Sequence, residues 1–262
     1  MQRVKTIITT AGRPDKETYQ LAVAASDILG YPVIERRKRS VRKMQDTYSA
    51  NVLVAGKDRY EYFVFGSEEP FFFHPNSAAF RLKRMLKGET DPLIEVSQLK
   101  PGDSFLDCTL GLASDSIIAS YVTGISGLVE GVEADPSVAF ITTKGLQAYK
   151  AKLPELSEAM RRIRVIHGNA IEHLKSQPDC SWDIVYVDTM FSAPIEESTN
   201  FASLRTAGMH SKMTEVWMEQ ALRVCRRRVV VKDHYDSDVF EEFRLNRVVR
   251  PNTKFHFGYA DR

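Results

Sequence analysis

The sequence predicts an α/β protein in which a doubly wound, mainly parallel sheet follows a small N-terminal α/β domain. After residue 102, short apolar runs alternate with helical segments of about 10 to 15 residues, which is typical of a parallel sheet covered by helices on both faces. Before that point the strand and helix patterns are sparser. A Pro-Gly turn within Leu99–Ser104 separates the two regions. We therefore expect domains at residues 1–98 and 99–262.

The N-terminal domain contains fewer predicted elements, and its topology stays open. The stretch PFFFHPNS is interpreted as a strand or a loop that closes on a turn. Apolar periodicity and punctuation predict a strand at Val4–Thr9, a helix at Asp15–Leu29, a strand or strand pair at Asn51–Phe65 and a helix at Ser77–Lys87.

The C-terminal domain is predicted to alternate regularly between strands and helices. In such a sheet, ligands bind beyond the carboxyl ends of the strands, close to the point where strand order reverses. The residues that follow each strand are therefore the place to search for function. The predicted strands cover 103–109, 127–134, 162–170, 183–189, 227–234 and 253–260, and the predicted helices cover 112–123, 136–150, 171–175 and 212–223.

Composition and charge exclude several classes of protein. With 43% hydrophobic and 27% charged residues, the chain has enough apolar material for a folded core. It contains no apolar run of about 20 residues and no secretory signal pattern, so we expect a cytoplasmic protein without a membrane partner. Three widely separated cysteines and six histidines without ligand spacing predict neither a disulfide framework nor a metal site.

Basic residues are concentrated in the first hundred residues, above all in the run ERRKRSVRK. Such a cluster can attract a polyanion through phosphate contacts, although a solvated surface face is the alternative. The helix at Ser77–Lys87 can line an RNA groove, and Lys232 at the end of VVVK can reach a phosphate or simply solvent. The candidate RNA contacts are Arg36, Arg37, Lys38, Arg39, Arg81, Lys83, Arg84 and Lys232.

Polar side chains end four successive strands of the C-terminal domain, namely Asp107, Glu133, Asn169 and Asp188. An acid at the end of the second strand can accept both hydroxyls of a ribose. The turn DCTLGLASD has the single glycine Gly111, not the G-x-G-x-x-G that brings the backbone close to a pyrophosphate. A nucleoside with a cationic group and no phosphate fits this pattern, and S-adenosyl-L-methionine is such a ligand. Each residue alone also fits a helix cap, a turn or a solvated position.

Four segments together resemble the bacterial small-subunit ribosomal RNA guanine-N2 methyltransferases: FLDCTLGLASDS, VEGVEADPSVA, DIVYVDTMF and RRVVVKDH. The resemblance covers roughly Phe72 to Asp233. It implies a Rossmann-like methyltransferase sheet and S-adenosyl-L-methionine as cofactor. By resemblance, Asp188 faces the methyl-transfer region and Phe191 stacks on the acceptor base. The expected cofactor contacts are Asp107, Gly111, Ser114, Asp115, Glu133, Ala134, Asn169, Ala170 and Asp188.

The expected activity is methylation of a base in small-subunit ribosomal RNA, with the guanine exocyclic amine as acceptor and the 30S particle or its RNA as partner. The chain departs from the family pattern where Thr189 and Ser192 replace prolines, and where Leu110 and Ala113 replace an alanine and a glycine. These departures leave two alternatives open. One is a non-catalytic RNA-binding or assembly protein on the same fold, and the other is a methyltransferase for a small molecule or a protein.

Overall fold

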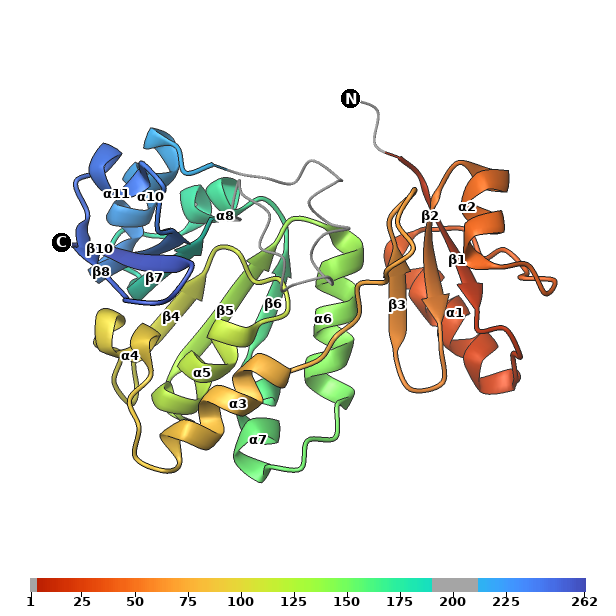
Figure 1. The fold of residues 1–262 in the computed structure, drawn as a ribbon, viewed down its shortest axis with the longest axis horizontal. Coiled ribbons are helices and arrows are strands. Elements are labelled where there is room, and N and C mark those ends of the chain that lie inside the picture. Colours follow the sequence, from red (N-terminus) through yellow and green to blue (C-terminus); the bar gives the residue numbers. More distant parts are fainter. Residues whose placement is uncertain (1–3, 190–211) are drawn as a thin grey trace. The chain divides into compact units, whose positions relative to one another are not determined.

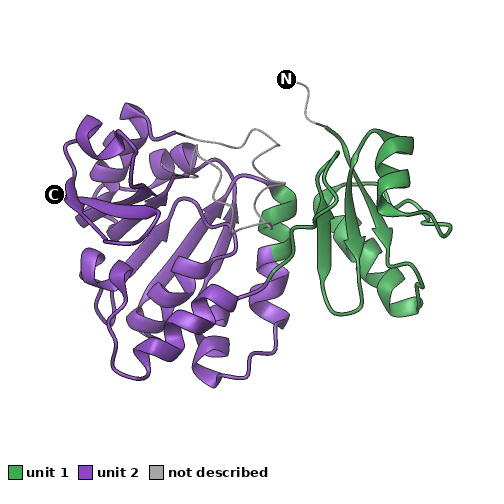
Figure 2. Cartoon of the chain, viewed as in Figure 1, with its two compact units in different colours: residues 1–73, 136–141, 196–209 green, residues 74–135, 142–195, 210–262 purple. Residues whose placement is uncertain are grey.

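The computed structural model describes residues 4–189 and 212–262, and these residues form two compact units (Figures 1 and 2). The N-terminal unit contains the described chain up to Phe73 together with Pro136–Ile141. The larger sheet lies in the second unit, which contains His74–Asp135, residues 142–189 and residues 212–262.

The N-terminal unit is a three-stranded sheet with helices packed against it (Figure 1). Strand β1 (Thr6–Thr10) pairs in parallel with β2 (Asn51–Ala55), and β3 (Tyr60–Phe63) pairs antiparallel with β2. The predicted strand pair within Asn51–Phe65 is therefore confirmed. All residues of β1 and β2 are buried, as expected for strands covered by helices.

Local capping explains the two helices of this unit. Helix α1 (Lys16–Leu29) begins with a capping box in which Asp15 accepts from the Thr18 amide at 2.8 Å, and it ends at Gly30, whose φ of 70° is left-handed. Helix α2 (Val41–Tyr48) was not predicted. Ser40 caps it by accepting from the Lys43 amide at 3.1 Å, so the basic run is divided between a loop and a helical turn.

The second unit contains a seven-stranded sheet in the order β6-β5-β4-β7-β8-β10-β9. The first five strands in this order are parallel, and β10 is antiparallel to its neighbours β8 and β9. This confirms the predicted doubly wound, mainly parallel sheet, whose strand order reverses between β4 and β7. The strands are β4 (Ser104–Asp107), β5 (Leu128–Glu133), β6 (Arg164–His167), β7 (Trp182–Asp188), β8 (Cys225–His234), β9 (Asn246–Val248) and β10 (Phe255–Asp261).

Helices of the second unit include three that the sequence did not predict, α4, α7 and α11. Helix α7 begins with Pro154 at its first position and buries Leu156, Ala159 and Met160. Among the described residues, none of the helices is long and apolar enough to cross a membrane. The helices are α3 (Asn76–Met85), α4 (Pro92–Ser97), α5 (Ser114–Thr123), α6 (Pro136–Ala148), α7 (Pro154–Arg162), α8 (Ala170–Ser176), α10 (Glu215–Val224) and α11 (Val239–Glu242). Of α6, only the part from Thr142 onward belongs to this unit.

The division between the compact units, at Phe73, lies earlier in the chain than the predicted boundary after residue 98. Helices α3 and α4 precede the large sheet in sequence but pack with it. Arg81 of α3 pairs with Asp115 of α5, and Arg228 of β8 donates to the carbonyl of Val96 in α4 at 2.6 Å. These contacts between distant segments have no signature in local sequence.

Candidate functional site

The carboxyl ends of the parallel strands bring together most of the polar residues that the sequence singled out. Asp107, Glu133 and Asp188 are the last residues of β4, β5 and β7, and Lys232 lies opposite Asp188 on β8. Because these strands run in the same direction, their ends form one edge of the sheet. This edge is the candidate active site.

Asp107 organises the turn between β4 and α5. One of its carboxylate oxygens accepts from the Thr109 amide at 2.9 Å, and the other accepts from the Ser116 hydroxyl at 2.6 Å. Thr109 in turn accepts from the Asp188 amide at 2.7 Å, which fastens the turn to β7. Burial raises the pKa of Asp107 to about 7. Both oxygens of Asp107 are thus engaged inside the protein.

The turn itself contains two residues in the left-handed region, Gly111 at φ 51° and Ala113 at φ 60°. The side chain of Leu110 occupies the space above Gly131 of β5, where an added Cβ would overlap with it. Leu110, which replaces the alanine of the family pattern, is therefore accommodated because the neighbouring strand has a glycine at position 131. Ser114 begins α5 and is partly exposed at the end of this turn.

Glu133 is held from two sides at the end of β5. Its carboxylate oxygens accept from the Gly111 amide at 3.1 Å and from the Asp135 amide at 2.9 Å, so each oxygen retains a lone pair for a ligand hydroxyl. Burial raises the pKa of Glu133 to about 7. The Gly168 amide donates to the Glu133 carbonyl, and an added Cβ at Gly168 would meet no heavy atom of the described chain within 4 Å. Open space therefore lies beside the ends of β5 and β6.

Three further predicted cofactor contacts lie near these strand ends. Asn169 caps α8, because its side-chain oxygen accepts from the Glu172 amide at 3.1 Å, and its amide NH2 group is left as a donor. Ala170 is almost fully buried in the core, whereas Ala134 is exposed. These residues lie near the strand ends, as expected from the sequence, and Asn169 caps a helix, whereas its structural alternative was a turn.

Asp115 is the centre of a buried charge network. It accepts from Arg81 Nη1 at 2.5 Å, from the Tyr186 hydroxyl at 2.8 Å and from Lys232 Nζ at 3.3 Å. Burial acts to raise the pKa of Asp115, but Lys232 and Arg81 outweigh it and hold that pKa well below its usual range. The negative charge of Asp115 is thus compensated within the protein by Arg81 and Lys232.

Asp188 shares Lys232 with Asp115. Its Oδ2 accepts from Lys232 Nζ at 2.5 Å, while Oδ1 is buried without a hydrogen-bond partner in the described part of the chain. Burial raises the pKa of Asp188 to about 6, although Lys232 opposes this shift. A buried carboxylate oxygen without a donor is unfavourable, which points to a ligand group that donates to it.

Thr189 follows Asp188 and explains one departure from the family pattern. Its amide and its hydroxyl both donate to the carbonyl of Lys232, each at 3.1 Å. Proline has no amide hydrogen and could make neither bond. Thr189 therefore extends the pairing between β7 and β8 by one residue and fixes the backbone beside Asp188.

Two of the eight predicted RNA contacts are internal. Arg81 pairs with Asp91 and Asp115, and Lys232 pairs with Asp115 and Asp188, so both are engaged in the charge network. The sequence predicted neither the pairing of Arg81 and Lys232 with these acids nor the hydrogen bond from Tyr186 to Asp115. The period-two alternation that puts Tyr186 and Asp188 on the same face of β7 was the available signal.

The other predicted RNA contacts lie nearer the surface. Lys83 is exposed, and Arg84 forms an exposed ion pair with Glu89 at 2.6 Å. Residues 36–39 lie in one loop of the N-terminal unit, where Arg37 and Lys38 are exposed. Phe191, the predicted stacking residue, is outside the described residues. Within residues 4–189 and 212–262 no group of three His, Cys, Asp or Glu side chains could hold a metal ion.

Known proteins resemble the chain in sequence and in fold. Residues 70–255 match the family described as "Putative SAM-dependent methyltransferase". The chain is 42% identical over 252 residues to the uncharacterized protein YpiP of Bacillus subtilis, covering 96% of this chain and 98% of that protein. It is 32% identical over 114 residues to ribosomal RNA small subunit methyltransferase J of Acinetobacter baumannii, covering 42% of this chain and 39% of that enzyme.

A solved structure shares the fold over nearly the whole chain. The SAM-dependent methyltransferase from Neisseria gonorrhoeae superposes with a TM-score of 0.56 at 18% identity, covering 97% of this chain and 95% of that one. The likeness of fold agrees with the match to the family across residues 70–255, which include the whole candidate site. The chain therefore belongs to the S-adenosyl-L-methionine-dependent methyltransferase family and is an enzyme that uses this cofactor.

Proposed function

We propose that the enzyme methylates a base in small-subunit ribosomal RNA and that the acceptor atom is the exocyclic amine of a guanine. The observation that carries this proposal is Asp188, whose Oδ2 is held by Lys232 while the buried Oδ1 has no donor among the described residues. An N–H group of the acceptor satisfies that oxygen. The sequence similarity to ribosomal RNA small subunit methyltransferase J supports RNA as the substrate class.

The residues at the strand ends fit the cofactor. The free lone pairs of Glu133 suit the two ribose hydroxyls, and the amide NH2 of Asn169 suits an acceptor on the adenine edge. Gly111 lies in the turn before α5 and donates its amide to Glu133, and Ser114 is the first residue of that helix. The bound cofactor supplies an electrophilic methyl group on its sulfonium. These contacts support the proposal that Glu133 and Asn169 hold the nucleoside half of the cofactor.

Asp188 can orient the acceptor amine, which is a weak nucleophile. An exocyclic guanine amine is a weak nucleophile because its lone pair is delocalised into the ring, so the site must orient the nitrogen and stabilise the positive charge that develops on it. A carboxylate whose pKa is about 6 is mostly ionised at neutral pH and can accept an amine N–H.

Lys232 and Thr189 position this carboxylate. Lys232 occupies Oδ2 and so directs Oδ1 toward the acceptor, and Thr189 fixes the following peptide by its two bonds to the Lys232 carbonyl. Lys232 is thus a positioning residue of the proposed site. Its charge is shared with Asp115, which prevents it from neutralising Asp188 completely.

A methyl-transfer assay tests the proposal. The protein is incubated with methyl-labelled S-adenosyl-L-methionine and with isolated 30S particles, naked small-subunit RNA, total cell protein or a small-metabolite extract. We expect label in the RNA arms, and nucleoside mass spectrometry should identify an N2-methylated guanosine. RNA from cells lacking the gene should accept more label than wild-type RNA. Label that appears only in the protein or metabolite arm would contradict RNA as the substrate class.

A further inference from the structure

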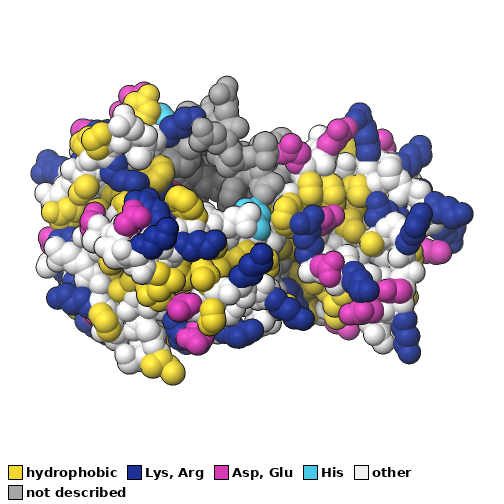
Figure 3. Space-filling model, turned by 60° about the horizontal axis from the view of Figure 1, so that its bottom comes forward, with side chains coloured by type: hydrophobic (Ala, Val, Ile, Leu, Met, Phe, Trp, Pro, Cys, Tyr) yellow, Lys and Arg dark blue, Asp and Glu magenta, His cyan; other side chains and the backbone are white. Residues whose placement is uncertain are grey.

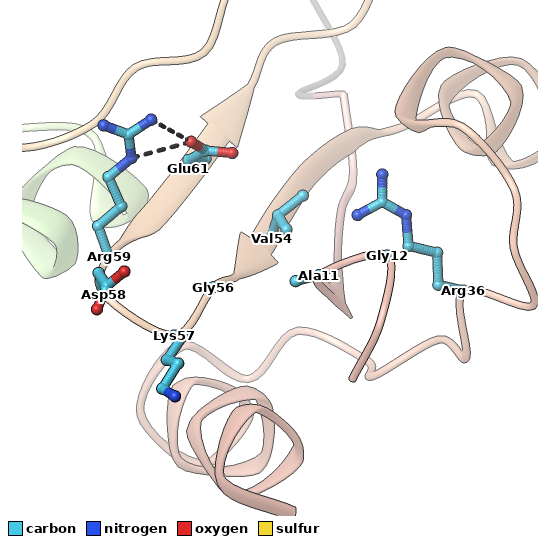
Figure 4. A pocket seen from close by; sticks show the side chains of 9 residues that line it. All are labelled: Ala11, Gly12, Arg36, Val54, Gly56, Lys57, Asp58, Arg59 and Glu61. Carbon is cyan, nitrogen blue, oxygen red and sulfur yellow. Dashed lines mark hydrogen bonds and ion pairs between the residues drawn. The ribbon is translucent and has the colours of Figure 1, made fainter. Parts of the chain in front are cut away.

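The N-terminal unit contains a cavity of about 460 Å³ beyond the carboxyl ends of its two parallel strands (Figure 4). Its walls come from residues 11–12 after β1, residues 56–59 between β2 and β3, Arg36 from the loop that precedes α2, Val54 of β2 and Glu61 of β3. Parallel strands commonly bind ligands at this end, and the volume suits a small ligand. None of these residues belongs to the candidate methyl-transfer site.

Arg36 is held rigidly at the wall of this cavity. Its Nε donates to the Arg39 carbonyl at 3.0 Å and its Nη1 donates to the Thr10 carbonyl at 3.1 Å. The loop that carries it is fixed in turn, because Arg39 donates to the carbonyls of Arg36 and Glu35. A guanidinium that is already ordered loses little entropy when it binds a ligand, and its remaining N–H groups suit a phosphate.

Two glycines, Gly12 and Gly56, line the cavity. The Gly56 amide donates to the Arg59 carbonyl at 3.0 Å, and a Cβ at Gly56 would lie only 2.8 Å from that oxygen, so this tight turn requires glycine. A Cβ at Gly12 would meet no heavy atom within 4 Å. The Gly12 side of the cavity is therefore open, and a side chain introduced there enters free space without disturbing the fold.

The charges that line the cavity leave a positive excess. Arg59 is neutralised by Glu61, which it contacts at 2.6 Å, and its guanidinium lies 3.7 Å from the centre of the Phe72 ring. The described lining also contains Arg36, Lys57 and the acid Asp58. Lys57 is exposed, and its positive charge contributes to the lowered pKa of Asp15, the residue that precedes α1.

On the face drawn in Figure 3, Lys and Arg side chains are interspersed with Asp and Glu over both units. Charge on this face alone therefore does not locate an anion, whereas the cavity combines an ordered arginine, an exposed lysine and an open glycine side.

We propose that this cavity binds the phosphate group of a nucleotide and that the phosphate belongs to the RNA substrate. Naming RNA rests on the proposed function, whereas the phosphate site itself does not. Arg36 supplies paired N–H donors to the phosphate oxygens, and Lys57 supplies a second positive charge. The cavity volume leaves room for the attached ribose.

The test measures binding of three probes to the full-length protein: inorganic phosphate, adenosine monophosphate and a short single-stranded RNA. Calorimetry serves for the small probes and fluorescence anisotropy for the RNA, each over a range of salt. The variants are Arg36→Gln, Lys57→Gln and Gly12→Asp, and Lys43→Gln is the matched control. Lys43 belongs to the same basic run but lies on α2, outside the cavity.

We expect each cavity variant to weaken RNA binding about tenfold, with the salt slope of Arg36→Gln and Lys57→Gln reduced by about 0.7 each, as for the loss of one phosphate contact. Lys43→Gln should bind nearly as wild type. Because Arg36 also holds the loop, Lys57→Gln and Gly12→Asp remain decisive if Arg36→Gln is unstable. Equal losses in Lys43→Gln and Lys57→Gln would overturn the proposal.

The small probes separate the sources of the phosphate. Adenosine monophosphate that binds in the cavity and competes with RNA supports RNA as the source. If the nucleotide binds and RNA affinity is unchanged in all cavity variants, RNA as the source is overturned. Failure of methyl transfer while Lys57→Gln still lowers RNA affinity would count against the proposed function and leave the phosphate site intact.

Discussion

The two units present opposite electrostatics at the same topological position. At the large sheet, Asp115 and Asp188 are partly buried and compensated by Arg81 and Lys232. At the small sheet, Arg36 and Lys57 line an open cavity together with Asp58. Charges that are compensated in a low dielectric suit the control of a reaction, whereas uncompensated charges near solvent suit the attraction of an anion.

Basic residues in buried ion pairs and exposed basic residues should also differ in what their removal changes. Removing one partner of a buried ion pair leaves a charge without compensation and costs several kcal/mol, but exposed pairs contribute little. Basic residues of the first unit should therefore affect binding, and those of the second unit should affect stability and transfer. Each prediction below tests one side of this difference.

The largest effect is expected for Asp188→Asn. The substitution removes the carboxylate that we propose faces the acceptor, so single-turnover methyl transfer should fall about 100-fold to 1,000-fold. Cofactor affinity measured by calorimetry should change little. Asp183→Asn is the control, because Asp183 lies at the opposite end of β7, where it accepts from the amide and hydroxyl of Ser104. Equal activity of Asp188→Asn and wild type would refute the proposed role of Asp188.

Arg81→Met should lower the free energy of unfolding by about 3 kcal/mol or more, because it leaves Asp91 and Asp115 without their shared cation. Arg84→Met, on the same helix but in an exposed pair, should cost less than about 1 kcal/mol. Lys57→Gln should be as mild. Urea denaturation followed by circular dichroism measures all three. If Arg81→Met lowered the free energy of unfolding as little as Arg84→Met and Lys57→Gln do, the expected difference between compensated and exposed cations would be refuted.

The pH dependence of transfer should report Asp188. Its carboxylate form accepts the acceptor N–H, and its pKa is about 6, so the single-turnover rate should rise about tenfold per pH unit below pH 6 and level off above pH 7. Lys232 lowers this pKa, and Lys232→Gln should therefore move the rise to higher pH. RNA binding through Arg36 and Lys57 should not change over this range. A flat rate profile between pH 5 and pH 8 would contradict the assignment.

The smallest effect concerns two buried threonines. Thr189→Val loses the hydroxyl bond to Lys232 and should cost about 1 kcal/mol, and Thr189→Pro should cost more because the amide bond is lost as well. Thr9 in β1 is buried, and its hydroxyl has no hydrogen-bond partner among the described residues, so Thr9→Val should be neutral or stabilising. Thermal unfolding distinguishes these outcomes. Equal costs at both positions would show that the hydroxyl bond of Thr189 contributes nothing.

Sequence patterns predicted the parts of the structure that depend on local chemistry. Alternating apolar runs gave the parallel strands, and the acids and amide that end β4, β5, β7 and the segment after β6 lie at one edge as expected. Helices α4 and α7 were not predicted, although the three buried residues of each have the i, i+3, i+4 spacing of a helix.

The charge network could not be predicted in the same way. Arg81 and Asp115 are 34 positions apart, and Lys232 and Asp115 are 117 positions apart, so only the tertiary fold brings them together. A lysine after a buried strand and an arginine on an amphipathic helix suggest solvent or RNA when taken alone. The packing of Leu110 against Gly131 also could not be predicted from the sequence, because neither residue is unusual in its own segment.

The bond between Arg81 and Asp115 bears on how this enzyme can be divided or transplanted. A fragment that begins at residue 99, where the sequence pattern changes, omits the guanidinium that compensates a buried acid beside the reaction site. It also omits Val96, whose carbonyl accepts from Arg228. A fragment that begins at His74 keeps both. The methyltransferase unit can therefore be moved to another protein only together with α3 and α4, which a recombination point chosen from the sequence would leave behind.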